Sequence, residues 1–486
     1  MHDVEVFGRL VAAVSIAASL AILSNRFSER TKIPAPALFL LAGAVASALF
    51  PSLNALSFES VQRIVTVALA VILFDGGMHI GRRRFREAAA PVMVLGVMGT
   101  ALTAAALGVL GHTVFGLDWK AAFLLGTALA ATDPAVVFSI LGKREIAGRA
   151  GTILEGESGA NDPVSIALMV VLLTATGTGG GAVAGGVGLF VLQMAVGLAI
   201  GLLGGWLMLL MMRRVPLPSA SLYSVRTLAA ALALYGVATI AQGSGFLAVF
   251  VAGILIGDER APYKAEIERF HGALASLGEI VAFAILGLTI DLGDVARSDV
   301  WVTGLGLGAL LMFVVRPVLV GVLVLPMRLT PAERTFILWA GLKGAVPILL
   351  GTFTITAGAA DASRIYHVIF VVVALSVILQ GGLVPWAAHR LGVPMRTIEP
   401  EPWAMGVRLR HEPEGMRREV VAKGSAADGS VIRDLELGED VWISIVTRAG
   451  RLVPIEGDTV LHAGDEVQTF GEPEATRSAA ALFKRS

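Results

Sequence analysis

Residues 157–163, Glu-Ser-Gly-Ala-Asn-Asp-Pro, place two carboxylates, an amide and a hydroxyl within two helical turns. They lie inside an apolar run of about 151–174, which is long enough to cross a bilayer. Residues four apart stack on a helix, so Ser158 lies next to Asp162 and Glu157 next to Asn161. Oxygen ligands suit hard cations and protons, and acids buried in a membrane are functional by default. We interpret this stretch as an ion site centred on Asp162.

The composition indicates a polytopic membrane protein, so the lipid bilayer is the first partner we expect. The chain has 486 residues, of which 55% are hydrophobic and 16% are charged. The net charge is zero, so no overall field favours nucleic acid. There is no cysteine, which excludes disulfides and thiolate metal sites.

Apolar runs of spanning length recur along the first 390 residues, and we predict about 13 transmembrane helices. The first run has no A-x-A cleavage pattern after it, so we expect a retained helix. Arginine and lysine concentrate in every second loop, which predicts a periplasmic N-terminus and a cytoplasmic C-terminus. The runs lie near residues 6–24, 34–50, 58–78, 88–115, 120–141, 151–174, 183–212, 224–241, 245–257, 272–290, 300–326, 335–357 and 364–388.

The composition changes after about Leu391, where the chain becomes polar and rich in Pro and Gly. We predict a transmembrane domain over 1–392, a linker over 393–412 and a small cytoplasmic α+β domain over 413–486. Within that domain the pattern favours strands at 441–448, 452–455 and 466–470, and a final helix over 473–483.

Two of the apolar runs contain a helix-breaking motif near the centre. These are Ala-Thr-Asp-Pro at 131–134 and Gly-Leu-Lys-Gly-Ala-Val-Pro at 341–347. Irregular backbone at membrane depth persists only where protein or a wet cavity surrounds it. Paired broken helices in two halves of a chain are typical of inverted-repeat transporters, a class that includes a sodium/proton antiporter.

We draw specific expectations for four of the further charges within or at the ends of the apolar runs. Helix ends that meet at a crossing carry about half a unit charge each, so Asp133 would stabilise facing N-termini and Lys343 facing C-termini. Direct ion contact is an equal alternative for Asp133. Arg316 needs a partner at mid-span, and we predict Glu157. Asp75, near the cytoplasmic end of its run, either caps that helix or lines an access path.

Other functional classes stay open at this point. Asp162 could be held in a permanent structural salt bridge. A ligand-gated cation channel would need a continuous pore, and a sensing receptor would tolerate a neutral residue at 162. A hydrolase would need a nucleophile and a base at one depth, and no mid-span Ser/His pair is evident, so we expect no enzyme and no cofactor.

In combination, four motifs resemble the monovalent cation/proton antiporter-1 family. They are residues 73–78 (Leu-Phe-Asp-Gly-Gly-Met), 131–134, 157–163 and 341–347. The chain is most similar to bacterial potassium/proton antiporters of the cell-volume-regulation type. Residues 441–471 resemble the C-terminal TrkA-C module of potassium-conductance regulators.

This resemblance implies a homodimer in the bacterial inner membrane, with two crossed, unwound helices in an ion-translocating core. Asp162 would carry a proton or a cation in turn, with Asp133, Ser158 and Thr132 completing the shell around K⁺ or Na⁺. Asn161, in place of a second aspartate, goes with electroneutral exchange. The TrkA-C-like module would bind a small molecule, such as a nucleotide. Lys343 departs from the arginine of many relatives, and Asp75 from the glutamate of several.

Overall fold

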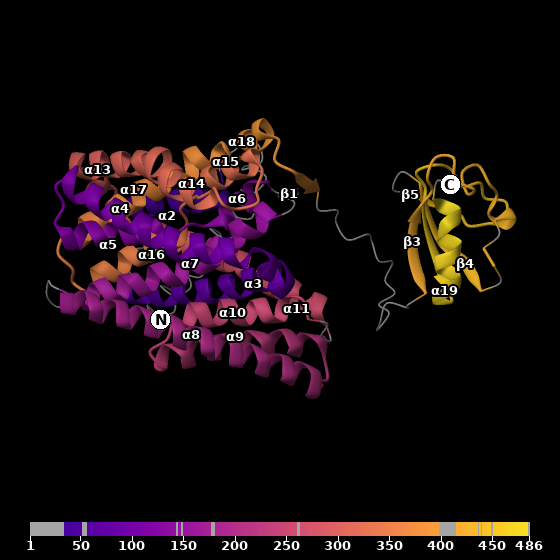
Figure 1. Ribbon diagram of the computed structural model, residues 1–486, viewed down its shortest axis with the longest axis horizontal. Helices are drawn as coiled ribbons and strands as arrows, with labels where there is room; N and C mark the ends of the chain where they lie inside the picture. The colour runs from indigo at the N-terminus through magenta and orange to yellow at the C-terminus, as the bar shows by residue number, and fades with distance from the viewer. Residues whose placement is uncertain are drawn as a thin grey trace. The chain divides into compact units, whose positions relative to one another are not determined.

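The chain forms two compact units, Met1–Ile398 and Glu399–Ser486 (Figure 1). The computed structural model describes residues 34–50, 56–141, 144–146, 149–175, 180–259, 263–397, 415–435, 437–438, 440–448 and 451–484. The first apolar run, 6–24, lies outside these residues. The first unit is almost entirely helical, which confirms the predicted fold class.

Every apolar run after the first is helical. Six helical stretches among the described residues are long and apolar enough to cross a membrane, and α2, α5, α10 and α16 are shorter apolar helices. The number of spans therefore stays a prediction. The α-helices are α2 (Ala35–Leu49), α3 (Phe58–Met93), α4 (Thr100–Thr113), α5 (Trp119–Ala130), α6 (Pro134–Leu141), α7 (Arg149–Thr174), α8 (Gly180–Arg214), α9 (Ala220–Ile240), α10 (Gly245–Gly257), α11 (Lys264–Leu288), α12 (Leu292–Val295), α13 (Ser298–Leu310), α14 (Arg316–Val324), α15 (Pro331–Trp339), α16 (Ala345–Thr356), α17 (Ala362–Leu375) and α18 (Val384–Leu391).

Three of the long helices contain a π-helical segment, in which the turn widens by one residue. These segments are η2 (Val94–Gly99), η3 (Leu311–Val315) and η4 (Ser376–Gly381). Segment η2 packs on α7, η3 leads directly into Arg316, and η4 supplies side chains to the unwound part of a broken helix. All three therefore lie close to the predicted ion site.

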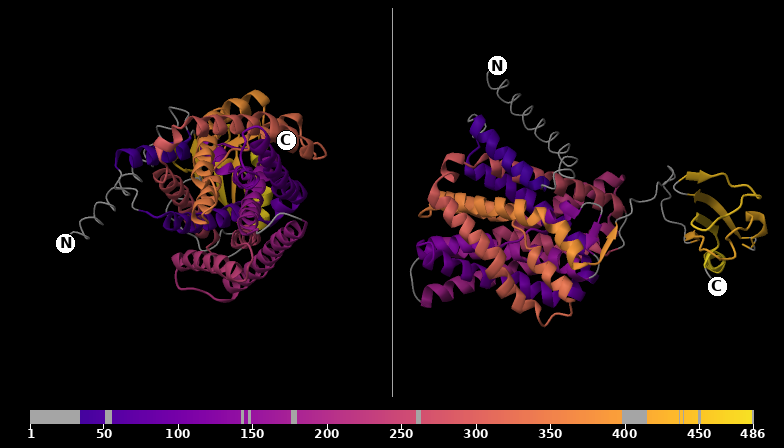
Figure 2. Two further views of the ribbon diagram at one scale, coloured as in Figure 1. Left: turned by 90° about the vertical axis from the view of Figure 1, so that its left-hand side faces the viewer. Right: turned by 90° about the horizontal axis from the view of Figure 1, so that it is seen from above.

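Helix α7, which carries residues 157–163, is central to the membrane unit. It packs against α3, α5, α8, α10 and η2. Figures 1 and 2 show α8 and α9 at the outer edge of the unit, while α13 and α17 pack together on the opposite side. The apolar window of α8 is only 11% buried, so this helix presents a largely apolar outer face.

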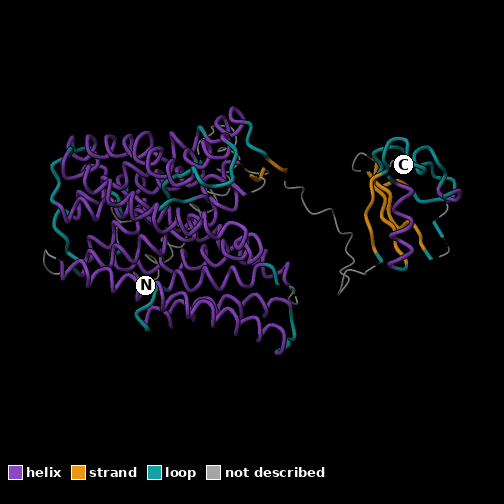
Figure 3. Tube along the Cα trace, viewed as in Figure 1, coloured by secondary structure: helices purple, strands orange, loops and turns teal. Residues whose placement is uncertain are grey.

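The C-terminal unit is a four-stranded antiparallel sheet with one helix, drawn in orange and purple in Figure 3. Its strands are β3 (Met416–Val420), β4 (Val441–Arg448), β5 (Arg451–Val453) and β6 (Glu466–Gly471), in the order β3-β6-β4-β5. Helix α19 (Pro473–Ala479) continues into the 3₁₀ turn η6 (Ala480–Phe483), and Phe483 is fully buried. The three predicted strands and the final helix are confirmed. Strand β3 was not predicted, because its sequence Met-Arg-Arg-Glu-Val has little apolar character.

Part of the predicted linker belongs to the membrane unit. Strand β2 (Met395–Thr397) pairs antiparallel with β1 (Arg144–Ile146), which lies between α6 and α7. Ile146 is buried, and its carbonyl lies against Gly151 in α7. The connection to the C-terminal unit therefore begins after β2 rather than at residue 393.

An ion pair between a partly exposed arginine and a buried carboxylate in the C-terminal unit predicts how its stability depends on pH. Arg448 donates two hydrogen bonds of 2.8 Å to the Asp465 carboxylate, whose side chain is 1% exposed. This pairing lowers the pKa of Asp465 below its ordinary value. A pKa lowered by folding stabilises the fold above the unfolded pKa of about 3.9, and that stabilisation is lost as pH falls towards the folded value.

We expect the unit comprising residues 413–486 to unfold at lower denaturant concentration as the pH is taken below about 4. Asp465→Asn should lower the midpoint at pH 7 and remove most of this acid dependence, whereas exposed Asp458→Asn should behave as wild type. Fluorescence of Trp442, the only tryptophan in these residues, would follow the transition. An Asp465→Asn protein with the wild-type acid profile would contradict this assignment.

Candidate ion-binding site

The two predicted breaks are present, and they meet. Helix α5 ends at Ala130 and α6 begins at Pro134, while α15 ends at Trp339 and α16 begins at Ala345. The Asp133 N–H donates to the Leu342 carbonyl across 2.8 Å, so the two non-helical segments are hydrogen-bonded to each other. Each broken helix therefore has backbone groups that lack helical hydrogen-bond partners, and these groups from the two helices lie at one shared point inside the unit.

Lys343 satisfies the end of the first broken helix. In a continuous helix the Ala130 carbonyl would accept from residue 134, but Pro134 has no N–H. The Lys343 ammonium instead lies 3.0 Å from the Ala131 carbonyl and 3.4 Å from the Ala130 carbonyl. Lys343 is 2% exposed, so these carbonyls are its visible hydrogen-bond partners and it stabilises the negative end of α5.

Arg316 satisfies the end of the second broken helix and pairs with Glu157. Its guanidinium donates to the carbonyls of Ile337 (3.0 Å) and Leu338 (3.1 Å) in the last turn of α15. It also donates to both carboxylate oxygens of Glu157, at 2.8 and 3.2 Å. Both side chains are about 5% exposed or less. The bidentate geometry uses the guanidinium fork in a way that lysine could not.

Two glycines allow these side chains to approach the second unwound segment. A Cβ atom on Gly341 would lie 2.0 Å from the Arg316 guanidinium carbon. A Cβ atom on Gly344 would lie 1.9 Å from a carboxylate oxygen of Asp133. Any side chain at these positions would push the charged groups away, so the crossing requires glycine at both.

Asp133 lies where two helices begin. It directly precedes Pro134, the first residue of α6, and its carboxylate lies against Gly344, the N-cap of α16. A negative charge stabilises a helix N-terminus, and here one carboxylate is close to two of them. The position is compatible both with helix-end stabilisation and with ion contact.

On α7, Asn161 and Asp162 have different surroundings. The Asn161 amide donates to the Thr132 hydroxyl (2.6 Å) and accepts from the Thr132 N–H (3.3 Å), so it ties α7 to the first unwound segment. Asp162 is 4% exposed and Ser158, one turn before it, is 6% exposed. The Asp162 oxygen Oδ1 is buried and has no hydrogen-bond partner among the described residues. Asp133 directly follows Thr132 and Lys343 bonds to the carbonyl directly before it, so both charges flank the residue that is tied to Asn161.

Asp75 lies in α3 and is 8% exposed. One of its oxygens is 3.3 Å from His79 Nδ1, and the other is buried without a partner in the described part of the chain. Gly272 of α11 is the neighbouring backbone. No hydrogen bond among the described residues joins Asp75 to α7.

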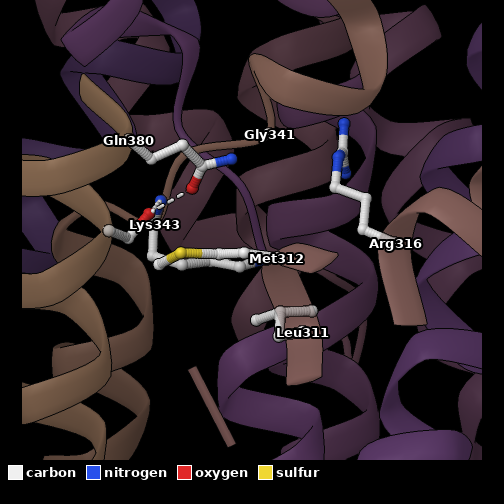
Figure 4. A pocket seen from close by; sticks show the side chains of 7 residues that line it. Leu311, Met312, Arg316, Gly341, Lys343 and Gln380 are labelled. Atoms are coloured by element: carbon white, nitrogen blue, oxygen red, sulfur yellow. Dashed lines mark hydrogen bonds between the residues drawn. The ribbon is translucent and has the colours of Figure 1, made fainter. Parts of the chain in front are cut away.

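Ser376 and Gln380, which are buried, and Glu279, which is partly buried, were not singled out from the sequence. Ser376 and Gln380 in η4 bond to the second unwound segment, and they line a narrow pocket with Lys343 and Arg316 (Figure 4). Glu279 in α11 has a buried carboxylate oxygen without a partner among the described residues. An acid within the apolar run 272–290 was a usable signal for Glu279. Ser and Gln in apolar helices give no comparable signal, because both commonly bond within their own helix.

The comparisons with known proteins agree with this geometry. A model of the transmembrane sodium/hydrogen exchanger family matches residues 14–390, and a TrkA-C domain model matches residues 416–484. The K⁺/H⁺ antiporter NhaP2 of Shewanella sp. strain MR-4 is 31% identical over 490 residues, covering 99% of this chain and 83% of the relative. The K⁺/H⁺ antiporter NhaP of Alkalimonas amylolytica is 33% identical over 382 residues, covering 78% of this chain and 66% of the relative.

A solved structure has the same fold over most of the chain. The sodium proton antiporter MjNhaP1 of Methanocaldococcus jannaschii superimposes with a TM-score of 0.67 at 22% sequence identity, and the alignment covers 80% of this chain and 99% of that one. The family match spans the crossing, α7 and Arg316, so the described site lies wholly within it. The chain therefore belongs to the sodium/hydrogen exchanger family of membrane transporters and carries a TrkA-C domain after its membrane unit.

Proposed function

We propose that this chain is a secondary transporter that exchanges a monovalent cation for protons, and that Asp162 is the group that binds each in turn. The observation that carries the proposal is a contrast within one helix. Glu157 is fully paired with Arg316, whereas Asp162, five residues later, has no ion pair among the described residues. A buried carboxylate without a fixed partner needs a bound proton or a bound cation. Because the same group binds one or the other, the arrival of one releases the other, and this is exchange.

The neighbours of Asp162 support the two bound states. Asp133, Ser158 and the Thr132 backbone supply further oxygen atoms from the crossing and from the same helix, which suits a monovalent cation. Asn161 is neutral and is already engaged with Thr132, so it adds no second titrating charge. We therefore expect one cation to exchange for one proton.

The crossing and the Glu157–Arg316 pair hold the architecture rather than carry the ion. They satisfy the backbone ends that two broken helices leave inside the membrane unit. The core then rocks against the remaining helices and exposes Asp162 to each side in turn, as in other transporters with broken helices. Asp75, with one unpartnered buried oxygen, lies on the proposed cytoplasmic access path.

K⁺ is the first cation to test, because the relatives that match the chain over nearly its whole length are named K⁺/H⁺ antiporters. Na⁺ is the second, because Synechocystis NhaS1, 25% identical over 392 residues, is named a low-affinity Na⁺/H⁺ antiporter. We place the protein in the bacterial inner membrane, with its N-terminus periplasmic and its TrkA-C domain cytoplasmic.

We also propose a homodimer that forms through the outer face of α8. This face exposes large apolar side chains along the helix, including Val183 and Leu203 (each 66% exposed) and Trp206 (58%). Lipid covers such a face in a monomer, and a second copy covers it in a dimer. The molecular mass in detergent distinguishes the two arrangements, and Trp206→Arg should shift a dimer towards the monomer.

Asp162→Asn should abolish cation-dependent proton flux in proteoliposomes that contain a pH-sensitive dye, because an amide neither releases a proton nor neutralises a cation. Its thermal midpoint in detergent should stay close to wild type. Wild-type exchange should proceed at the same initial rate under an imposed membrane potential of either sign. Flux that survives in the Asp162→Asn protein would exclude this residue as the carrier.

Glu157→Gln is the matched contrast on the same helix. It leaves the Arg316 charge buried without its carboxylate, which costs roughly 3–5 kcal/mol in comparable buried pairs. We expect a markedly lower thermal midpoint for Glu157→Gln than for Asp162→Asn. If Asp162→Asn instead lowers stability as strongly, Asp162 is a structural residue and the carrier proposal is wrong.

The TrkA-C domain, we propose, adjusts exchange in response to a small ligand, and a nucleotide is the first class to test. The β1–β2 pairing supports this proposal, because the connection to the domain is attached to the loop between α6 and α7. Asp133 directly precedes α6 and Asp162 lies in α7. A displacement of β2 would therefore reach both sides of the ion site.

Two truncations separate the domain from its attachment. Truncation after Ile398 removes the domain and keeps β2, and it should retain exchange while changing the apparent cation affinity. Truncation after Val393 also removes β2, so it should in addition lower the thermal midpoint, because β1 loses its partner. Unchanged cation affinity in the Ile398 truncation would make the domain an assembly module only.

A further inference from the structure

The second broken helix is interrupted by a specific pair of side chains from η4. In a continuous α-helix the N–H of Lys343 would donate to the carbonyl of Trp339, four residues earlier. Here the Lys343 N–H donates to Ser376 Oγ at 3.1 Å, and the Gln380 side-chain amide donates to the Trp339 carbonyl. The Ser376 hydroxyl donates to Gln380 Oε1 at 2.9 Å. The two side chains thus stand between a backbone donor and acceptor that would otherwise bond directly.

We propose that Ser376 and Gln380 are positioning residues that keep the second broken helix open and thereby hold Lys343 in place for exchange at Asp162. We refer to the pair as the Ser376–Gln380 insert. The inference rests on the proposed function of Asp162. It assigns a role to two residues that contact neither the ion nor the carboxylates.

The insert is fully enclosed, and its position is fixed by the fold. Ser376 is 0% exposed and Gln380 is 2% exposed. The residues are the first and fifth of the π-helical segment, so both side chains point to the same side of the helix. Figure 4 shows Gln380 next to Lys343 on one side of the pocket and Arg316 on the other. A side chain inserted into the hydrogen-bond ladder is a recognised cause of a helix break.

The insert completes the set of donors at the end of α15. Arg316 satisfies the carbonyls of Ile337 and Leu338, and Gln380 satisfies the carbonyl of Trp339. Without the insert, the N–H of Lys343 and the carbonyl of Trp339 would both be buried and unpaired, which carries a free-energy cost for each group. Rewinding by one turn would remove that cost, and it would move Lys343.

Movement of Lys343 would change the charges around Asp162. The Lys343 ammonium is held on the carbonyls of Ala130 and Ala131, directly before Thr132. Thr132 hydrogen-bonds to Asn161, the residue before Asp162, so Lys343 places a positive charge beside the segment that is tied to the Asp162 turn. If Lys343 leaves this position, the ionised form of Asp162 loses its positive neighbour.

Few other charges face Asp162 from the elements packed on α7. Helices α6, α10 and α16 and segment η2 contain no ionisable residue. Helix α3 carries Asp75 and His79 in its middle, and its other ionisable residues are Glu59, Arg63, Arg82, Arg83, Arg84, Arg86 and Glu87. Of these, Arg84 lies 3.7 Å from Glu155 of α7. The ionisable residues on the other packed elements are Arg144, Glu145, Lys120, His112, Arg213, Arg214, Glu333 and Arg334.

The test compares Ser376→Ala and Gln380→Met in the full-length protein with Ser376→Thr, which keeps the hydroxyl. Cation-dependent proton flux in proteoliposomes is measured over a pH series, and thermal midpoints are measured in detergent. We expect Ser376→Ala and Gln380→Met to move the pH of half-maximal exchange upwards by about half a unit or more, because Asp162 then keeps its proton to higher pH. Ser376→Thr should retain the wild-type profile.

The double variant should shift the profile no further than the larger single shift, because the two residues act as one connection. Thr354→Val is the matched control, since this buried hydroxyl bonds only within its own helix. A loss of stability with an unchanged pH profile would overturn the inference, as would additive shifts in the double variant. If Gln380→Met does not fold, the comparison of the pH profiles of Ser376→Ala and Ser376→Thr tests the inference.

This outcome is distinguishable from failure of the proposed function. If the wild-type protein shows no cation-dependent proton flux, exchange at Asp162 is wrong and the insert has no transport role to test. If the wild type exchanges and Asp162→Asn does not, but the two η4 variants keep the wild-type profile, only the inference about Ser376 and Gln380 falls.

Discussion

Two helices are broken inside the membrane unit. Their backbone groups that lack helical hydrogen bonds need partners from the protein, because lipid offers none. Each unsatisfied group in such surroundings costs several kcal/mol. Lys343 satisfies the carbonyl end of α5, and Arg316 with Gln380 satisfies that of α15. The same two cations neutralise the helix ends and set the charges near α7. The arrangement of the ion site therefore depends on how the crossing is completed.

The crossing also explains why two carboxylates on one helix have different roles. Arg316 reaches the end of α15 and Glu157 at the same time, so Glu157 is committed to the architecture. Lys343 is committed to the α5 carbonyls and does not form an ion pair with Asp162 among the described residues. Asp162 forms no ion pair among the described residues, which is the condition that our proposal of proton and cation exchange requires.

The C-terminal unit has its own core and sheet, and one short ladder attaches its connection to the membrane unit. Strand β2 pairs with β1, between the helix half that follows Asp133 and the helix that carries Asp162. This contact consists of the backbone pairing of two three-residue strands and the burial of Ile146. A strand this short has no marked apolar pattern, which explains why residues 395–397 resembled a linker.

The sequence alone determined the apolar runs, the two breaks and the family, because hydrophobic length, proline and glycine are local signals. Buried charge is a local signal too, and it predicts the residues that we propose for the ion site. It also predicted the strands at 441–448 and 466–470 and the final helix. Only the tertiary structure decided which groups meet: Lys343 with Ala131, Asn161 with Thr132, and Ser376 with Gln380 between the two ends of an open helical turn. The first two contacts join residues 212 and 29 positions apart, and the third joins two ordinary polar side chains. A local sequence pattern shows neither which distant residues meet nor which polar side chains pair.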